Sequence, residues 1–188
     1  MKKFIFMFVI FISNLALADK AVFAGGCFWC MEPPFEKLEG VSQVLSGYSG
    51  GEAGMANYKA VSAGGTGHKE AIEVTYDPAK ITYEKLLDVY FKNVDPFDAV
   101  GQFCDKGDSY KSVIFTGNDA EKKIAEEKLK KVQDTKKALG KVVTEIVPLK
   151  KFYPAEDYHQ DYYKKNPVRY KYYRYRCGRD SRLEAIGL

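Results

Sequence analysis

Residues 21–30 read Ala-Val-Phe-Ala-Gly-Gly-Cys-Phe-Trp-Cys, and this stretch decides how the fold begins. The apolar run 21–24 predicts a short strand, which the glycine pair ends because glycine permits a sharp turn. From Cys27 onward the sequence predicts the first turn of a helix. A thiol therefore lies on a strand-to-helix turn, beside the only Trp of the chain, with a second thiol at Cys30. Because a helix N-terminus lowers the pKa of a thiol, we expect Cys27 to be an exposed, reactive nucleophile.

The first eighteen residues have the layout of a secretory signal peptide. Lys2-Lys3 form a basic start, an apolar stretch covers residues 4–12, and Ala16-Leu17-Ala18 is a cleavage site of the A-x-A type. The apolar stretch is shorter than the ~20 residues of a membrane-spanning helix, so we expect cleavage after Ala18. The expected mature chain is a single domain, residues 19–188, exported to the periplasm and in contact with a membrane only through its leader.

The charge of the chain gives no case for a nucleic-acid partner. The formal net charge is +4, and removal of Lys2-Lys3 with the leader lowers it to +2. The Lys-rich stretch 122–141 alternates with acidic residues and indicates a solvated helix face. Arg and Lys alternate with Tyr over 169–176, but no base-stacking motif of an RNA-binding domain accompanies them.

The hydrophobic patterns predict one α+β domain. Further strands are expected at 41–48, 69–76, 111–116 and 142–147, and helices at 82–91, from Asn118 to Gly140, and at 155–165. Pro33-Pro34 predict a kink or a restart of the first helix. This order predicts a two-layer sandwich of the ferredoxin-like plait type, with a mixed sheet covered by helices on one side. The C-terminus is expected to be a long irregular tail.

Four cysteines remain in the expected mature chain: Cys27, Cys30, Cys104 and Cys177. Disulfides persist in an oxidising compartment, and four cysteines allow three full pairings. The C-x-x-C of the first two fits a redox pair better than a zinc site. A zinc site usually needs a second close pair of ligands, which the distant cysteines and the two histidines of the chain do not provide.

Three other segments carry candidate polar groups. Glu70 follows a Gly-rich loop and becomes a general acid if an apolar pocket raises its pKa, although spacing alone favours a solvent-facing strand residue. Residues 102–110 form a polar turn that ends in Tyr110. His159 lies on an expected aromatic helix face, where a packed, hydrogen-bonded role is more common than a catalytic one.

Six motifs, taken in order, resemble peptide methionine sulfoxide reductase A. They are Gly26-Cys27-Phe28-Trp29, Gly47-Tyr48-Ser49-Gly50-Gly51, Asn57-Tyr58, Gly65-Thr66-Gly67-His68-Lys69-Glu70, Asp105 to Tyr110, and Ala155 to Gln160. They extend over nearly all of residues 21–165. The resemblance implies that the protein reduces the S epimer of methionine sulfoxide, free and in proteins, and thereby repairs oxidised proteins.

The resemblance also implies a role for each matching residue. The nucleophile is Cys27, and Phe28 and Trp29 form the walls for the substrate methyl group. The acid is Glu70, which Tyr58 and Tyr110 assist by hydrogen bonding to the sulfoxide oxygen. Asp105 orders the site through water. Attack leaves a sulfenic acid, a second thiol converts it to a disulfide, and a thioredoxin-like protein reduces that disulfide. No metal or organic cofactor is implied, and we expect a monomer.

The thiol that resolves the sulfenic acid stays open among three candidates, because the chain departs from the commonest family pattern at each. Cys177 is the first choice, since a mobile tail can carry it to Cys27. Cys30 is second, because its spacing suits a disulfide only if the first helical turn distorts. Cys104, on the opposite loop, is the third candidate.

Two other functions remain in view. A thioredoxin- or glutaredoxin-like oxidoreductase also has a C-x-x-C after its first strand, and Val147-Pro148 resembles the substrate-side proline of that fold. A thioredoxin-like function would leave the later motifs of this chain without a role. An exported Tyr-rich binding module with two structural disulfides and no reactive thiol is the non-enzymatic alternative.

Overall fold

The computed structural model describes residues 18–188. The expected signal peptide therefore lies outside the described residues, apart from Ala18 at its expected cleavage site. Within residues 18–188, none of the helices has both the length and the apolar character needed to cross a membrane.

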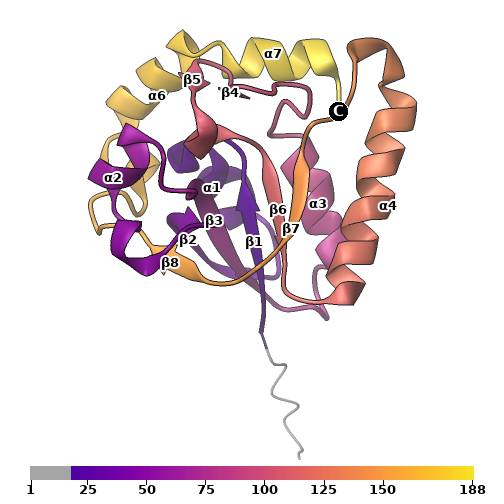
Figure 1. The fold of residues 1–188 in the computed structure, drawn as a ribbon, viewed down its shortest axis with the longest axis horizontal. Coiled ribbons are helices and arrows are strands. Elements are labelled where there is room, and N and C mark those ends of the chain that lie inside the picture. Colours follow the sequence, from indigo (N-terminus) through magenta and orange to yellow (C-terminus); the bar gives the residue numbers. More distant parts are fainter. Residues whose placement is uncertain (1–17) are drawn as a thin grey trace, which may run out of the picture.

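A six-stranded mixed sheet forms the centre of the protein (Figure 1). Its strands, in sheet order, are β7 (Glu145–Pro148), β6 (Val113–Thr116), β1 (Asp19–Ala24), β3 (Lys69–Tyr76), β2 (Val41–Ser49) and β8 (Phe152–Pro154). Only β6 and β7 pair in parallel, while the other neighbours are antiparallel. A parallel pair needs a long crossover, and helix α4 (Asp119–Thr135) provides it. The α+β class and the mixed sheet are as predicted.

The other elements surround this sheet. They are α1 (Phe28–Glu36), α2 (Tyr58–Ala63), α3 (Tyr83–Phe91), α5 (Tyr162–Lys165), α6 (Pro167–Arg176), α7 (Arg179–Ile186), the 3-10 turns η1 (Ala53–Met55), η2 (Asp108–Tyr110) and η3 (Lys137–Leu139), and the hairpin of β4 (Gly101–Gln102) and β5 (Asp105–Lys106). Asn118 caps α4 as predicted, because its side chain accepts a hydrogen bond from the Glu121 N–H at 2.9 Å. The helix ends at Thr135, before the predicted Gly140.

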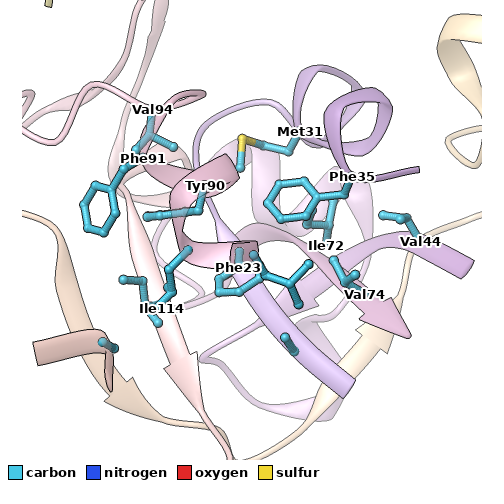
Figure 2. Close-up of a cluster of buried hydrophobic side chains, with 14 of the residues drawn as sticks. Phe23, Met31, Phe35, Val44, Ile72, Val74, Tyr90, Phe91, Val94 and Ile114 are labelled. Atoms are coloured by element: carbon cyan, nitrogen blue, oxygen red, sulfur yellow. The ribbon is translucent and has the colours of Figure 1, made fainter. Parts of the chain in front are cut away.

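Alternation along β1 supplies side chains to both faces of the sheet. Phe23 lies among the residues of the main core, where Figure 2 shows Ile72 and Ile114 from neighbouring strands close to Phe35 and Tyr90 from α1 and α3. The alternate positions of β1 belong to a smaller cluster on the opposite face, which packs against Val147 of β7, Phe152 of β8 and Leu149 between these strands. Helices α1, α3 and α4 all contribute to the main core, so the helical layer covers one face as predicted.

The turn between β1 and α1 requires its two glycines. Gly26 has φ of +82°, and a Cβ there would lie 2.6 Å from the Cβ of Gln102. A Cβ on Gly25 would lie 2.5 Å from Cγ1 of Val94. The chain therefore passes directly from the strand into α1 with Cys27 as the N-cap residue. Both residues of Pro33-Pro34 lie inside α1, which continues without the expected restart.

The expected irregular tail is wrong, because the C-terminus forms α5, α6 and α7. Pro167 is at the first position of α6, where its fixed φ and missing N–H favour a helix start. Neither α6 nor α7 has an aliphatic stripe: α6 has no buried residue, and α7 buries only Arg179 and Ile186. The helix expected at 155–165 forms only over its last turn, after Asp161 adopts a left-handed φ of 55°.

Candidate active site

Eight residues line a small pocket of about 80 Å³ at the N-terminus of α1: Cys27, Phe28, Trp29, Tyr58, Glu70, Asp105, Tyr110 and Tyr173. The first seven are the residues to which the resemblance assigns catalysis or substrate binding. The eighth, Tyr173, comes from α6 and had no signal in the sequence. The pocket therefore combines α1, α2, β3, the hairpin β4–β5, η2 and α6 in one place.

The two thiols of the C-x-x-C motif are both free and both buried. Burial, followed by the hydrogen bond and charge of Cys30, raises the pKa of the Cys27 thiol well above its usual value. The pKa of Cys30 is instead lowered to about 7, because it receives the hydrogen bond from Cys27 and lies near Arg179 and Arg174. The expectation of an exposed Cys27 with a low pKa is therefore wrong. When the buried pair loses its first proton, the negative charge therefore resides on Cys30.

Glu70 is the second residue of β3 and is only 3 % exposed. The N–H of Phe28 donates a hydrogen bond to its Oε2 at 3.1 Å, which fixes the carboxyl beside the first turn of α1. Burial raises the pKa of Glu70 to about 8, although that hydrogen bond acts in the opposite direction. The carboxyl group is thus protonated at neutral pH, and the solvent-facing position favoured by spacing alone is wrong.

Trp29 is held by two contacts behind the pocket. Its indole Nε1 donates a hydrogen bond to Nδ1 of His159 at 3.0 Å, and its ring stacks on Tyr162 with centroids 3.7 Å apart. His159 is 1 % exposed and also lies 4.9 Å from the ring of Phe28. It has the packed, hydrogen-bonded role that the sequence favoured. These contacts fix the apolar wall of the pocket.

Tyr58 and Tyr110 supply the polar part of the pocket. Burial and the nearby Glu70 raise the pKa of both hydroxyl groups, so each remains a hydrogen-bond donor at neutral pH. The backbone N–H of Tyr58 donates to Oε1 of Glu156 at 2.9 Å, and the hydroxyl of Tyr48 donates to Oε2 of the same carboxylate at 2.9 Å. Glu156 thus anchors the start of α2 beside the pocket.

The turn of the β4–β5 hairpin fixes the C-terminal helices at three consecutive residues. Phe103 places its ring 4.4 Å from the guanidinium carbon of Arg179, and Cys104 forms a disulfide with Cys177, with Cα atoms 4.8 Å apart. Asp105 accepts a hydrogen bond from the hydroxyl of Tyr173. Figure 1 shows α6 and α7 at the same end of the molecule as this hairpin. Of the three resolving candidates, two are therefore bonded to each other, and only Cys30 lies beside Cys27.

Two groups of side chains among the described residues have metal-ligand spacing. One is Cys104, Asp105 and Cys177, in which the sulfurs are already joined. The other is Glu32, Glu36 and Asp161, away from the pocket. A separate pocket of about 240 Å³ lies between Gly50, Phe115 and Val147, and no thiol lines it. The free thiol of Cys27 therefore shares its pocket with Glu70 and the two tyrosines.

The chain is similar to known proteins along nearly the whole of its described length. The model of the family described as peptide methionine sulfoxide reductase matches residues 19–186. A peptide methionine sulfoxide reductase MsrA of Listeria welshimeri is 50 % identical over 167 residues, which cover 89 % of this chain and 94 % of that protein.

Two solved structures share the fold. The reduced form of Mxr1 from Saccharomyces cerevisiae is 35 % identical with a TM-score of 0.75, over 82 % of this chain and 89 % of the other. Mxr1 in complex with Trx2 is 27 % identical with a TM-score of 0.54, over 79 % of this chain and 87 % of the other. The chain belongs to the peptide methionine sulfoxide reductase A family and is an oxidoreductase that reduces methionine sulfoxide.

Proposed function

We propose that this protein reduces the S epimer of methionine sulfoxide, free and in proteins, with Cys27 as the nucleophile. The observation that carries the proposal is the pocket in which Cys27 lies beside a buried, protonated Glu70. A sulfoxide oxygen is a poor leaving group until it is protonated, so an acid must lie next to the attacking sulfur. The apolar wall of Phe28 and Trp29 suits the methyl group of the substrate.

In the first step, the sulfur of Cys27 attacks the sulfoxide sulfur and forms a sulfur–sulfur bond, the thiol proton passes to the Cys30 thiolate, and Glu70 transfers its proton to the oxygen. The hydroxyl group then moves from the substrate sulfur to Cys27. The sulfur–oxygen and sulfur–sulfur bonds to the substrate break, methionine leaves, and Cys27 is left as a sulfenic acid. One thiol and one sulfoxide thus give one sulfenic acid and one thioether. The hydroxyl groups of Tyr58 and Tyr110 donate hydrogen bonds to the oxygen during transfer, and Asp105 orders the polar side of the pocket.

In the second step, Cys30 attacks the sulfenic sulfur, a disulfide forms and water leaves. We assign this role to Cys30 ahead of the first sequence choice, Cys177. The support is that Cys30 exchanges a hydrogen bond with Cys27 and ionises at about pH 7, whereas Cys177 is bonded to Cys104. A low pKa in the attacking thiol favours condensation at neutral pH.

In the third step, a thioredoxin-like dithiol reduces the Cys27–Cys30 disulfide without a metal or organic cofactor. The complex of the related Mxr1 with Trx2 supports this reductant class.

We also propose export to the periplasm, where the monomeric enzyme repairs oxidised proteins and needs an exported electron donor. The same proposal assigns the segment from β1 to β6 to the ferredoxin-like plait, which its strand order β6-β1-β3-β2 supports.

Steady-state reduction of the two sulfoxide epimers with dithiothreitol tests the function. Turnover of the S epimer by the wild type, its loss in Cys27→Ser, and no turnover of the R epimer are expected. Reduction of insulin disulfides without sulfoxide turnover would instead assign a thioredoxin-like activity. A tail-located resolving thiol would appear as normal disulfide formation in Cys30→Ser.

A further inference from the structure

Arg179 is the largest fully buried side chain in the described part of the chain, and the reaction steps above do not use it. It is 1 % exposed and begins α7, immediately after Gly178 reverses the chain with φ of 65°. Arginine stays protonated in proteins, so its burial places a full positive charge in the interior. A buried charge is costly unless an opposite charge or several hydrogen bonds compensate it.

The guanidinium contacts residues on both sides of the C-x-x-C segment. Its Nη2 donates to the carbonyl oxygen of Gly25 at 3.2 Å and contacts Sδ of Met31 at 3.1 Å, and it also donates to the carbonyl of Asn93. A Cβ placed on Gly26 would lie 3.6 Å from its Nη1. The charge is therefore centred under the turn that carries Cys27 and Cys30.

Carboxylates do not account for this charge. Ion pairs in residues 18–188 include Arg174 with Asp180 and Arg182 with Asp95, but none involves Arg179. Its Nε has no hydrogen-bond partner there. Asp105 is close enough to be influenced by the charge, yet its Oδ2 accepts from Tyr173 instead.

We propose that Arg179 is a positioning residue whose buried charge holds the Cys27–Cys30 pair as a thiolate at neutral pH. The thiolate and the guanidinium then compensate each other in a site that excludes water. Three of the charged or titratable groups around the pair come from other elements: Glu70 on β3, Asp105 on β5 and Arg174 on α6. Glu70 is neutral, Asp105 opposes the thiolate and Arg174 assists it. Tyr173 and Tyr170 stay protonated, because burial raises the pKa of each.

The remainder of this end of the molecule holds Arg179 in place. Phe103 packs against the guanidinium, and the adjacent Cys104 is bonded to Cys177, two residues before Arg179. The hairpin turn and α7 thus fix the cation relative to the thiols. This inference deepens the proposed function, but it concerns the ionisation of the thiols and can be measured without a sulfoxide.

The test compares Arg179→Gln with Arg182→Gln, a matched change one turn further along α7. Glutamine keeps an amide donor at position 179, but it is shorter than arginine and uncharged, so Arg179→Lys is included as the variant that keeps the charge. Protein with Cys27 and Cys30 reduced and the Cys104–Cys177 disulfide intact is pulsed with iodoacetamide from pH 5 to 10, and mass spectrometry gives the alkylation rate of each free cysteine. Absorbance at 240 nm follows the total thiolate. Because Cys104 and Cys177 stay bonded, both signals come from the C-x-x-C pair.

In the wild type and in Arg182→Gln, the first thiolate of the pair should form with a midpoint near pH 7. In Arg179→Gln the midpoint should rise by at least about one pH unit, roughly a tenfold loss of thiolate at low occupancy. Arg179→Lys keeps the charge, so its midpoint should lie close to that of the wild type. An unchanged midpoint in folded Arg179→Gln, or an equal shift in Arg182→Gln, overturns the proposal.

If Arg179→Gln does not fold, the pH dependence of stability decides. In reduced wild type the thiolate forms at lower pH in the folded than in the unfolded state, so the contribution of this thiol to stability should rise between about pH 7 and 9. The opposite contribution of Glu70 is common to the wild type and Cys30→Ser. Cys30→Ser leaves the cation without its counter-charge and should lack that rise. Parallel profiles for the two proteins would refute the role of Arg179. A shifted midpoint together with no sulfoxide turnover would refute the proposed function and leave the role of Arg179 intact.

Discussion

Replacing Glu70 by Gln should make the protein more stable and nearly inactive. Burial raises the pKa of Glu70 from 4.5 to about 8, so the folded state binds a proton that the unfolded state releases. Stability therefore falls as pH rises from 4.5 towards 8. At 1.36 kcal/mol per pKa unit, the full loss amounts to as much as about 5 kcal/mol. The substituted glutamine would be neutral at every pH and would retain an oxygen for the N–H of Phe28, so the variant should not share this loss.

Urea unfolding at pH 5, 6, 7, 8 and 9 measures the effect as the difference in unfolding free energy between Glu70→Gln and the wild type. That difference should grow steadily with pH up to about 8 and then level off. Titration of the thiols is common to both proteins and largely cancels. Glu73→Gln, on the same strand, is the control, because its ion pair with Lys20 is worth at most about 1 kcal/mol.

The activity of Glu70→Gln tests whether the buried carboxyl group acts as an acid in the reaction. Loss of a general acid should lower kcat/KM for the sulfoxide by about 10²–10⁴, while Glu73→Gln should remain close to the wild type. A difference in stability that stays constant within about 0.5 kcal/mol from pH 5 to 8 would show that Glu70 is ionised in the folded protein. The acid assignment would then be refuted, whatever the activity of the variant.

Three further predictions follow from the same site. Replacing both Cys104 and Cys177 by Ser should lower the free energy of unfolding by about 4 kcal/mol, given the sequence separation of 73 residues. Sulfoxide turnover by this variant should still end in a disulfide. A variant as stable as the wild type in non-reducing urea would contradict a stabilising role of the Cys104–Cys177 disulfide. Cys30→Ser should release one methionine per enzyme and stall as a sulfenic acid that dimedone traps, and continued turnover with a thioredoxin-like reductant would reject it as the resolving thiol. The pH–rate profile should rise with a midpoint near 7 as the thiolate forms and fall near 8 as the buried carboxyl ionises, so a rate that keeps increasing to pH 10 would contradict the required protonated acid.

The regular part of the fold was predictable because its hydrophobic pattern is local. The strand expected at 69–76 is β3 with the same bounds, since alternate residues pack on opposite faces of the sheet. The cap at Asn118 is likewise a matter of four adjacent residues. Such signals depend on near neighbours and need no knowledge of the tertiary structure.

The C-terminal helices were not predictable in this way, because side chains far away in sequence stabilise them. Arg179 counts as a surface residue in any hydrophobic pattern, yet it is buried under the turn at Gly25. Tyr173 reaches the pocket through its contact with Asp105, 68 residues earlier. The even number of cysteines was a usable signal for a disulfide, but three pairings fitted it equally well. Only the fold distinguishes the Cys104–Cys177 bond from the alternatives.

Glu70 shows the same limit at the level of chemistry. The sequence named it as an acid only through its resemblance to a family, because spacing cannot tell whether a strand carboxyl faces water or a pocket. In the structure, one buried region shifts two groups in opposite directions. Burial raises the pKa of the Glu70 carboxyl to about 8, whereas the hydrogen bond from Cys27, with Arg179 and Arg174 nearby, lowers the pKa of Cys30 to about 7. Groups with opposed shifts can coexist near neutral pH as a proton donor and a proton acceptor. In the proposed reaction, the thiolate of Cys30 would accept the Cys27 proton as that sulfur attacks, while Glu70 would give its own proton to the departing oxygen.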